Sequence, residues 1–178
     1  MVSTTDPVTA PTGSNDSGGQ TTTYAAQGAG NKSRGVQSLL DTTGFGSVIV
    51  SWDQRLSNTA SRYTQFQYTT DGTTFVDATA GLFTGAAGDT WYNNRSVDLT
   101  RAAGAANNAN FGFRIIAAFA PATSSYAAAT TGSSYATTGT HRFDRVTVNV
   151  TAVPEPESYA LMPAGRGATG LLVARRRA

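Results

Sequence analysis

The chain has 178 residues, enough for one domain with tails, and only 13% of them are charged. Residues 1–152 carry equal numbers of acidic and basic side chains, so the net charge of +2 comes from the tail that begins at Val153. A neutral body without a basic stripe argues against nucleic-acid binding, and the absence of cysteine excludes disulfides, thiolate metal sites and a cysteine nucleophile.

The first 35 residues are rich in Thr, Ser, Gly, Asn and Gln. Such a segment buries too little apolar surface to offset its ordering entropy. We therefore predict that residues 1–35 are disordered, or that they form a loosely attached first strand around TTTYAAQG. The opening residues, MVSTTDPVTAPTGSND, have neither the basic start nor the apolar run of a secretory signal peptide. If the protein is exported, we expect its signal peptide to be missing from this chain.

Short β-branched or alternating segments begin near Gly46 and predict strands. An Asp-Gly pair at 71–72 separates two of them and predicts a hairpin, because both residues tolerate a positive φ. The segment FGFRIIAAF carries apolar residues on both faces and predicts a central strand. The predicted strands cover 47–52, 62–69, 73–78, 95–100, 111–119 and 142–150, and the predicted loops cover 84–94, 101–110 and 120–140.

Six or more short strands with turn signals between them indicate an all-β fold. We predict an antiparallel two-sheet sandwich of the jelly-roll type over residues 36–152, with a β-barrel as the alternative. No internal repeat of fixed period is visible, which argues against a solenoid or propeller.

The chain ends in VPEPESYALMPAGRGATGLLVARRRA. Pro154, Glu155 and Pro156 cannot continue a sheet, because the prolines lack a backbone donor and fix φ. A mostly apolar stretch follows, and it ends at Arg175, Arg176 and Arg177. An apolar segment beside a terminal positive cluster is the arrangement of a membrane segment held by cytoplasmic charges.

These residues closely resemble the PEP-CTERM sorting signal of exopolysaccharide-producing Gram-negative bacteria. The resemblance implies that residues 153–178 are a sorting signal, that an exosortase processes it after transient anchoring in the inner membrane, and that the protein is extracellular or on the cell surface. Pro163 and Arg166 depart from the Leu-rich helix of the family. An Arg in mid-segment costs about 2.5–3.5 kcal/mol on insertion scales, so we expect this tail to insert poorly.

The body carries a second resemblance. The segments SVIVSWDQRLSNTASRYTQFQYTTDGTTF and YATTGTHRFDRVTVNV look like a β-sandwich domain common among proteins with this tail, and FDRVTVNV is similar to the last strand of galactose-binding-like modules. This resemblance implies contact with carbohydrate, such as an extracellular polysaccharide, although the fold alone does not carry a function.

A sugar-binding site needs flat aromatic faces beside amide and guanidinium groups that bond the hydroxyls. The segment GDTWYNNR offers the best such cluster, and we expect it in a loop. Tyr126 and Tyr135 are expected to be further exposed aromatics. The alternative is that the Trp of this cluster plugs one end of the sandwich. The predicted ligand-binding residues are Trp91, Tyr92, Asn93, Asn94 and Arg95.

A structural Ca²⁺ is the one cofactor that the sequence suggests, because sandwich modules often hold this hard cation through Asp and backbone oxygens. Asp144 is the first candidate ligand and Asp41 the second. There is no Asp-x-Asp-x-Asp loop.

Catalysis has little support in the sequence. His141 is the one histidine, no Gly-x-Ser-x-Gly elbow occurs, and the body contains scattered aspartates and no glutamate. For Asp53 and Asp144 a structural ion pair with Arg55, Arg62, Arg114 or Arg142 is favoured over acid–base chemistry. We therefore expect no enzymatic activity. A structural or adhesive matrix protein without a defined ligand, and a polysaccharide hydrolase, are the rival interpretations.

Overall fold

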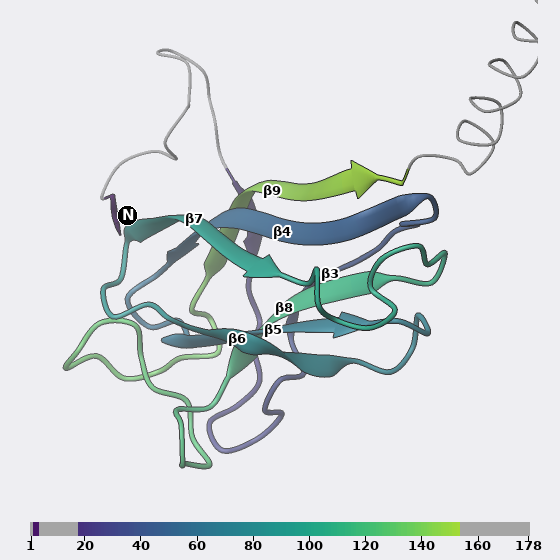
Figure 1. Cartoon of the computed structure of the whole chain (residues 1–178). Coiled ribbons are helices and arrows are strands. Elements are labelled where there is room, and N and C mark those ends of the chain that lie inside the picture. The colour runs from purple at the N-terminus through teal and green to yellow at the C-terminus, as the bar shows by residue number, and fades with distance from the viewer. Residues whose placement is uncertain (1, 4–17, 154–178) are drawn as a thin grey trace, which may run out of the picture.

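The computed structural model describes residues 2–3 and 18–153, and this part of the chain contains strands, turns and loops but no helix. The strands form two antiparallel sheets that face each other (Figure 1). The five-stranded sheet has the order β1-β7-β4-β9-β2 and the four-stranded sheet has the order β3-β8-β5-β6. The strands are β1 (Val2–Ser3), β2 (Gly19–Thr21), β3 (Gly35–Leu39), β4 (Phe45–Leu56), β5 (Tyr63–Thr69), β6 (Val76–Thr84), β7 (Thr90–Asp98), β8 (Gly112–Ala118) and β9 (His141–Ala152).

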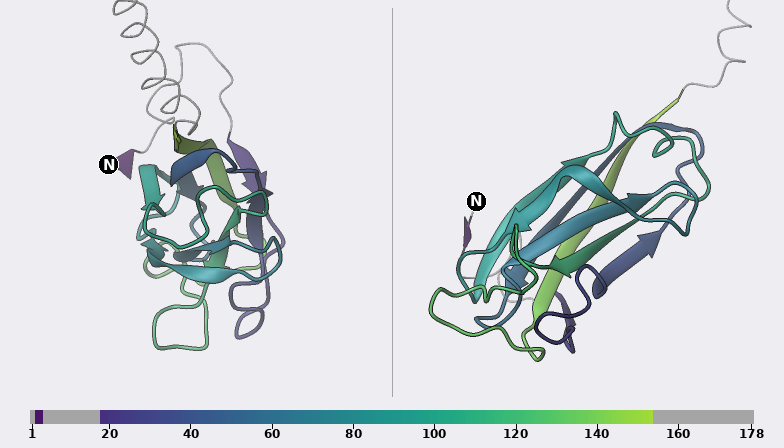
Figure 2. Two further views of the ribbon diagram at one scale, coloured as in Figure 1. Left: turned by 45° about the vertical axis from the view of Figure 1, so that its right-hand side comes forward. Right: turned by 90° about the horizontal axis from the view of Figure 1, so that it is seen from below.

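Apart from the two-residue β1, the chain is a set of nested antiparallel pairs. The hairpin β5–β6 is innermost, and β4 with β7, β3 with β8 and β2 with β9 follow outward along the sequence. Rolling such a nested ribbon distributes eight strands over two four-stranded layers, which is the jelly-roll arrangement. Figure 2 shows the sandwich turned by 45° about the vertical axis and from below. The predicted two-sheet sandwich is therefore confirmed.

The core lies between the layers and is built from alternate residues of the long strands. Val48, Val50 and Trp52 of β4 point inward and are almost fully buried. The Trp52 ring stacks on Phe66 of β5 at a centroid distance of 5.5 Å, and Phe66 stacks on Phe113 of β8 at 5.5 Å. β8 pairs with strands on both sides, as predicted for FGFRIIAAF.

Several strand predictions differ from the structure. β4 and β9 are longer than predicted, running from Phe45 to Leu56 and from His141 to Ala152. β7 begins at Thr90, so the expected loop 84–94 is strand over most of its length, and β6 continues to Thr84. β3 was not predicted, because it is an edge strand whose residues alternate little in polarity. The hairpin at the Asp-Gly pair is confirmed, with Gly72 at φ 77° inside a loop of residues 70–75.

The side chains of β9 do not alternate between the two faces of the sheet along the whole strand. The sequence pattern places Phe143 and Val148 on opposite faces, yet both pack against the core. The reason is a β-bulge in the β4–β9 pairing between Ser51 and Asp53, where Arg145 has a left-handed φ of 49°. One extra residue on β9 reverses the facing of every side chain beyond it.

The predicted boundary at residue 36 falls inside an ordered region. β2 pairs with the start of β9, β3 already begins at Gly35, and Tyr24 between them is buried. The Tyr24 ring stacks on His141 at 4.6 Å, so the segment from residue 18 onward is part of the sandwich. The rest of the predicted disordered segment, apart from Val2–Ser3, lies outside the described residues.

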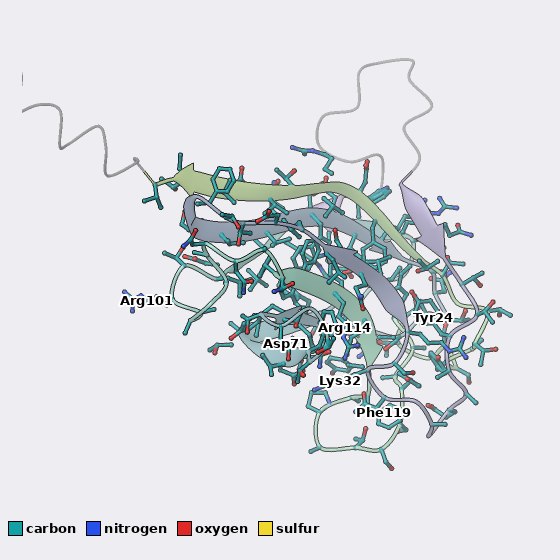
Figure 3. All side chains as sticks on the ribbon, turned by 90° about the vertical axis from the view of Figure 1, so that its right-hand side faces the viewer. Tyr24, Lys32, Asp71, Arg101, Arg114 and Phe119 are labelled. Atoms are coloured by element: carbon teal, nitrogen blue, oxygen red, sulfur yellow. The ribbon has the colours of Figure 1, made fainter. Side chains whose placement is uncertain are left out.

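The outer face of the four-stranded sheet carries a connected polar network (Figure 3). Lys32 forms an ion pair with Asp77, Gln67 donates to the same carboxylate at 2.6 Å, and Arg114 donates to Gln67 at 2.6 Å while its guanidinium lies over the Phe75 ring. Burial raises the pKa of Asp77, but the hydrogen bonds from Lys32 and Gln67 outweigh it and leave that pKa below its ordinary value. Each charged group in this network has a partner.

Candidate functional site

The five residues predicted to bind a ligand lie in strand β7 rather than in a loop, and they do not share one face. Tyr92 pairs with Gln54 and Arg95 with Trp52, whose side chains point into the sandwich. Trp91 pairs with Arg55 on the outer face. The loop prediction for this segment was therefore wrong, and the alternation of the strand divides the cluster between two faces.

Trp91 is packed rather than displayed, with 4% of its surface exposed. A Cβ atom placed on Gly18 would lie 3.0 Å from the Trp91 ring carbon Cη2, so the indole reaches across the outer face of the sheet toward the residue that precedes β2. A residue larger than glycine at position 18 would clash, since that Cβ would also lie 2.7 Å from a backbone oxygen of β9. Trp91 thus has a packing role, but on the outer face of the sheet, whereas the alternative prediction had it plugging one end of the sandwich.

The two tyrosines expected to be exposed are also packed. Tyr126 is buried and stacks on Tyr135 at 4.5 Å, and its ring meets Phe119 edge-on at 4.6 Å. Tyr135 is half-buried and its hydroxyl donates to the carbonyl of Ala25 at 2.7 Å. These rings form a small satellite core beneath the loop of residues 120–140.

Arg95 crosses the space between the sheets and is fully engaged there. Its guanidinium donates to Gln54 Oε1 at 2.6 Å, to Thr64 Oγ1 at 3.2 Å and to the carbonyl of Thr84 at 3.0 Å. It also lies 4.7 Å from the centre of the Tyr92 ring. Burial lowers the pKa of Arg95 to about 10, which leaves the group charged at neutral pH. Arg95 is thus a structural cation of the core.

His141 occupies the same interior end of the sandwich and has no catalytic arrangement around it. Its ring is sandwiched against Tyr24, and Nδ1 lies 3.3 Å from Gln54 Nε2. Burial, reinforced by the positive charge of Arg95, lowers the pKa of His141 to about 3. A neutral imidazole at that depth serves packing between Tyr24 and the strand end.

The outer face of the five-stranded sheet holds the aspartates that the sequence singled out. Asp53 is buried, its Oδ1 accepts the backbone N–H of Asn94 at 2.7 Å, and Arg145 Nη1 lies 3.5 Å from its Oδ2. Asp144 Oδ1 accepts the N–H of Arg145 at 2.7 Å. The expected ion pair exists for Asp53, but its partner is Arg145 instead of any of the four arginines predicted.

Those four arginines are engaged elsewhere. Arg55 pairs with Asp89 at 3.3 Å and Arg142 donates to Gln20 at 2.9 Å. Arg62 donates to the carbonyl of Ala128 at 3.0 Å, and Arg114 belongs to the network on the opposite sheet. Arg145 was missed because the bulge that turns it toward Asp53 leaves no sign in the sequence.

Unsatisfied polar atoms gather beside Asp53. Within residues 2–3 and 18–153, buried side-chain atoms without a hydrogen-bond partner include Asp53 Oδ2, Asp144 Oδ2 and both amide atoms of Asn93. Asp53 pairs directly with Asp144 on β9, and a second bulge places Asn93 and Asn94 opposite Asp53 on β7. Asn93 was predicted as a ligand-binding residue, but its place opposite Asp53 in the sheet was not.

The structure separates the two predicted calcium ligands. Asp41 is exposed in the loop before β4, where its Oδ1 accepts the N–H of Thr43 at 2.7 Å. Hydrogen bonding to the Thr43 side chain, and then to the Thr43 N–H, lowers the pKa of Asp41. Asp144 lies beside the other end of β4. Asp41 and Asp144 therefore cannot bind one ion together. Among the described residues, no three His, Cys, Asp or Glu side chains are placed to hold a metal.

Pro154, Glu155, Pro156 and the three terminal arginines lie outside the described residues. Within the described part of the chain no helix has the length and apolar character needed to cross a bilayer. Comparisons with protein-family models, with curated proteins and with solved structures found no match for this chain.

Proposed function

We propose that the chain is an exported, non-enzymatic protein of the cell surface or exopolysaccharide matrix, consisting of a jelly-roll cargo and a C-terminal sorting segment that an exosortase processes at the inner membrane. The observation that carries the proposal is the Pro-Glu-Pro, apolar, Arg-rich order of residues 154–177. Support comes from its position: β9 ends at Ala152, and the N–H of Val153 bonds the carbonyl of Gly44 at 2.8 Å (Figure 1). The motif starts directly after that bond.

A reporter fusion tests this proposal. Residues 153–178 are joined to a secreted reporter with its own signal peptide, in a host that has an exosortase. We expect the reporter to be cleaved and released, and we expect the joint change of Pro154, Glu155 and Pro156 to Ala to abolish cleavage. Glu157→Ala, a change of the neighbouring acid outside the motif, is the matched control and should leave cleavage intact. Equal cleavage of all three fusions contradicts the proposal.

For the mature domain we propose contact with an extracellular polysaccharide, in preference to a purely structural matrix role. Support comes from the exposed outer face of the five-stranded sheet, where small polar side chains stand in rows across three strands. Ser51 pairs with Ser96 on one side and Thr147 on the other. Hydroxyl and amide groups on an exposed sheet face can bond the hydroxyls of a sugar chain. Because Trp91 is buried, the exposed amide of Asn94 is the better candidate contact among the predicted residues.

Glycan-array binding by the full chain tests the second proposal. Asn94 has a φ of 56°, so Asn94→Gly removes the amide without backbone strain. We expect it to lower the apparent affinity for bound glycans several-fold. Asn107→Gly is the matched control, because Asn107 is exposed with a φ of 50° in the loop before β8. A chain that binds no glycan, or equal binding by both variants, favours the structural interpretation.

A further inference from the structure

The outer face of the five-stranded sheet places two carboxylates directly opposite each other. Asp53 of β4 and Asp144 of β9 are partners in the antiparallel ladder, and like charges in that position repel. The Oδ1 atom of each carboxylate accepts a hydrogen bond from a backbone N–H at 2.7 Å. Each Oδ2 remains buried without a hydrogen bond among the described residues. Among the described residues, no positive group therefore donates a hydrogen bond to either free oxygen, and Arg145 approaches only that of Asp53.

Asn93 adds a third unsatisfied oxygen from the neighbouring strand. Asn93 is 4% exposed, and neither atom of its amide has a hydrogen-bond partner in the described part of the chain. The register shift in the β4–β7 pairing leaves Asn93 and Asn94 opposite Asp53. Because the Tyr92 side chain points into the sandwich, alternation along the strand places Asn93 on the outer face, which is the face of Asp53. An orphaned buried polar group costs about 1–3 kcal/mol, so three such groups on neighbouring strands would be stabilised by a common partner.

The burial of these atoms restricts what that partner can be. Asp53 is 1% exposed, and the free Oδ2 atoms are covered, so a sugar ring cannot reach them. A single ion can be enclosed at such a place. Carboxylate and amide oxygens are the ligands that a hard cation prefers, and Ca²⁺ also accepts backbone and water oxygens to complete its shell.

The arginines nearby do not neutralise the free oxygens of Asp53 and Asp144 by direct hydrogen bonds. Arg145 Nη1 is 3.5 Å from Asp53 Oδ2, beyond a good hydrogen bond, and its side chain is 38% exposed. Arg55 and Arg142 stand one residue pair further along the same face and are engaged by Asp89 and Gln20. We infer that Asp53, Asn93 and Asp144 form a cation site of calcium type, in which Arg145 competes with the ion for Asp53. This inference goes beyond the proposed function and does not depend on the tail.

Thermal unfolding of the full chain in EDTA and in increasing CaCl₂ tests the site. Selective binding to the folded state should raise the Tm of the wild type by about 5–10 °C at a hundredfold excess over Kd. Asp144→Asn should abolish the calcium-dependent rise, yet in EDTA its Tm should equal or exceed that of the wild type, because one repelling charge is gone. A variant that is merely damaged would melt lower in both conditions.

Two further variants keep the inference falsifiable. Asp41→Asn, which changes an exposed carboxylate at the far end of β4, should keep the full calcium-dependent rise. Arg145→Gln should lower the calcium concentration at half-effect about tenfold, because the competing cation is removed. If CaCl₂ shifts neither the wild type nor Arg145→Gln, or if the rise is lost in Asp41→Asn and kept in Asp144→Asn, the site does not exist.

Discussion

His141 shows how one buried side chain links stability to pH. It is the single histidine of the chain, and burial holds the pKa of its ring near 3, against an ordinary value of 6.5. Below pH 6.5 the unfolded chain binds a proton that the folded chain refuses until about pH 3. The folded state therefore loses stability as the pH falls from 6.5 toward 3, and its stability does not depend on this group above pH 6.5.

We predict that the free energy of unfolding falls by about 2–3 kcal/mol between pH 7 and pH 4.5. The measurement is urea denaturation at half-unit pH steps. The aspartates with lowered pKa values, such as Asp71, titrate below this window, so the slope reports on His141. His141→Gln should flatten the profile between pH 7 and pH 4.5. A wild-type profile that is already flat there would show that the ring takes up a proton in the folded state.

The residue types in the sequence were enough to identify part of the candidate site. Asp53, Asn93 and Asp144 were each singled out for a stated chemical reason, but in three separate roles. Their placement on three neighbouring strands at the level of Asp53 depends on two bulges that add one residue to β7 and one to β9. A bulge at a non-glycine residue such as Arg145 leaves no mark in composition or periodicity, so neither the cluster nor the Asp53–Arg145 contact was predictable.

At the scale of strands, prediction succeeded where a side-chain pattern reflects burial on one face. β5 and β8 alternate large apolar residues toward the core, and both were predicted within one residue of their bounds. β3 fails this criterion, because its position is set by pairing with β8 rather than by its own apolar face. The first half of β7 was also not predicted as a strand, because polar residues occupy both its buried and its exposed positions.

The docking of β3 depends on close backbone approach. A Cβ atom on Gly35 would lie 2.0 Å from the carbonyl oxygen of Ile115 in β8, and neither strand can give way without losing ladder hydrogen bonds. We predict that Gly35→Ala costs about 1–3 kcal/mol of stability and speeds amide hydrogen exchange throughout β3. Gly19→Ala is the control: its nearest non-neighbouring atom is at 3.8 Å, so we expect a change within about 0.5 kcal/mol. Equal costs for the two variants would contradict this account.

At the scale of the whole molecule, the nested pairing makes the last strand the closing element of the sandwich. β9 pairs along β4 from His141 to Ala152, and its far end covers Val48, which is fully buried. The last backbone bond that the structure describes is the one from Val153 to Gly44. All the described core contacts thus precede the Pro-Glu-Pro motif, and the cargo should fold without the sorting segment.

We predict that a chain ending at Val153 melts within about 1 °C of the full chain, because no described strand pair is lost. A chain ending at Asn149 should lose roughly 2–4 kcal/mol, since the pairings of Val150, Thr151 and Ala152 with β4 and their hydrogen bonds disappear. Calorimetry of the three chains decides the matter. A drop in Tm for the chain ending at Val153 would mean that residues 154–178 pack on the sandwich. The claim that the sandwich folds independently of the sorting segment would then be wrong, even if the reporter fusion were still cleaved.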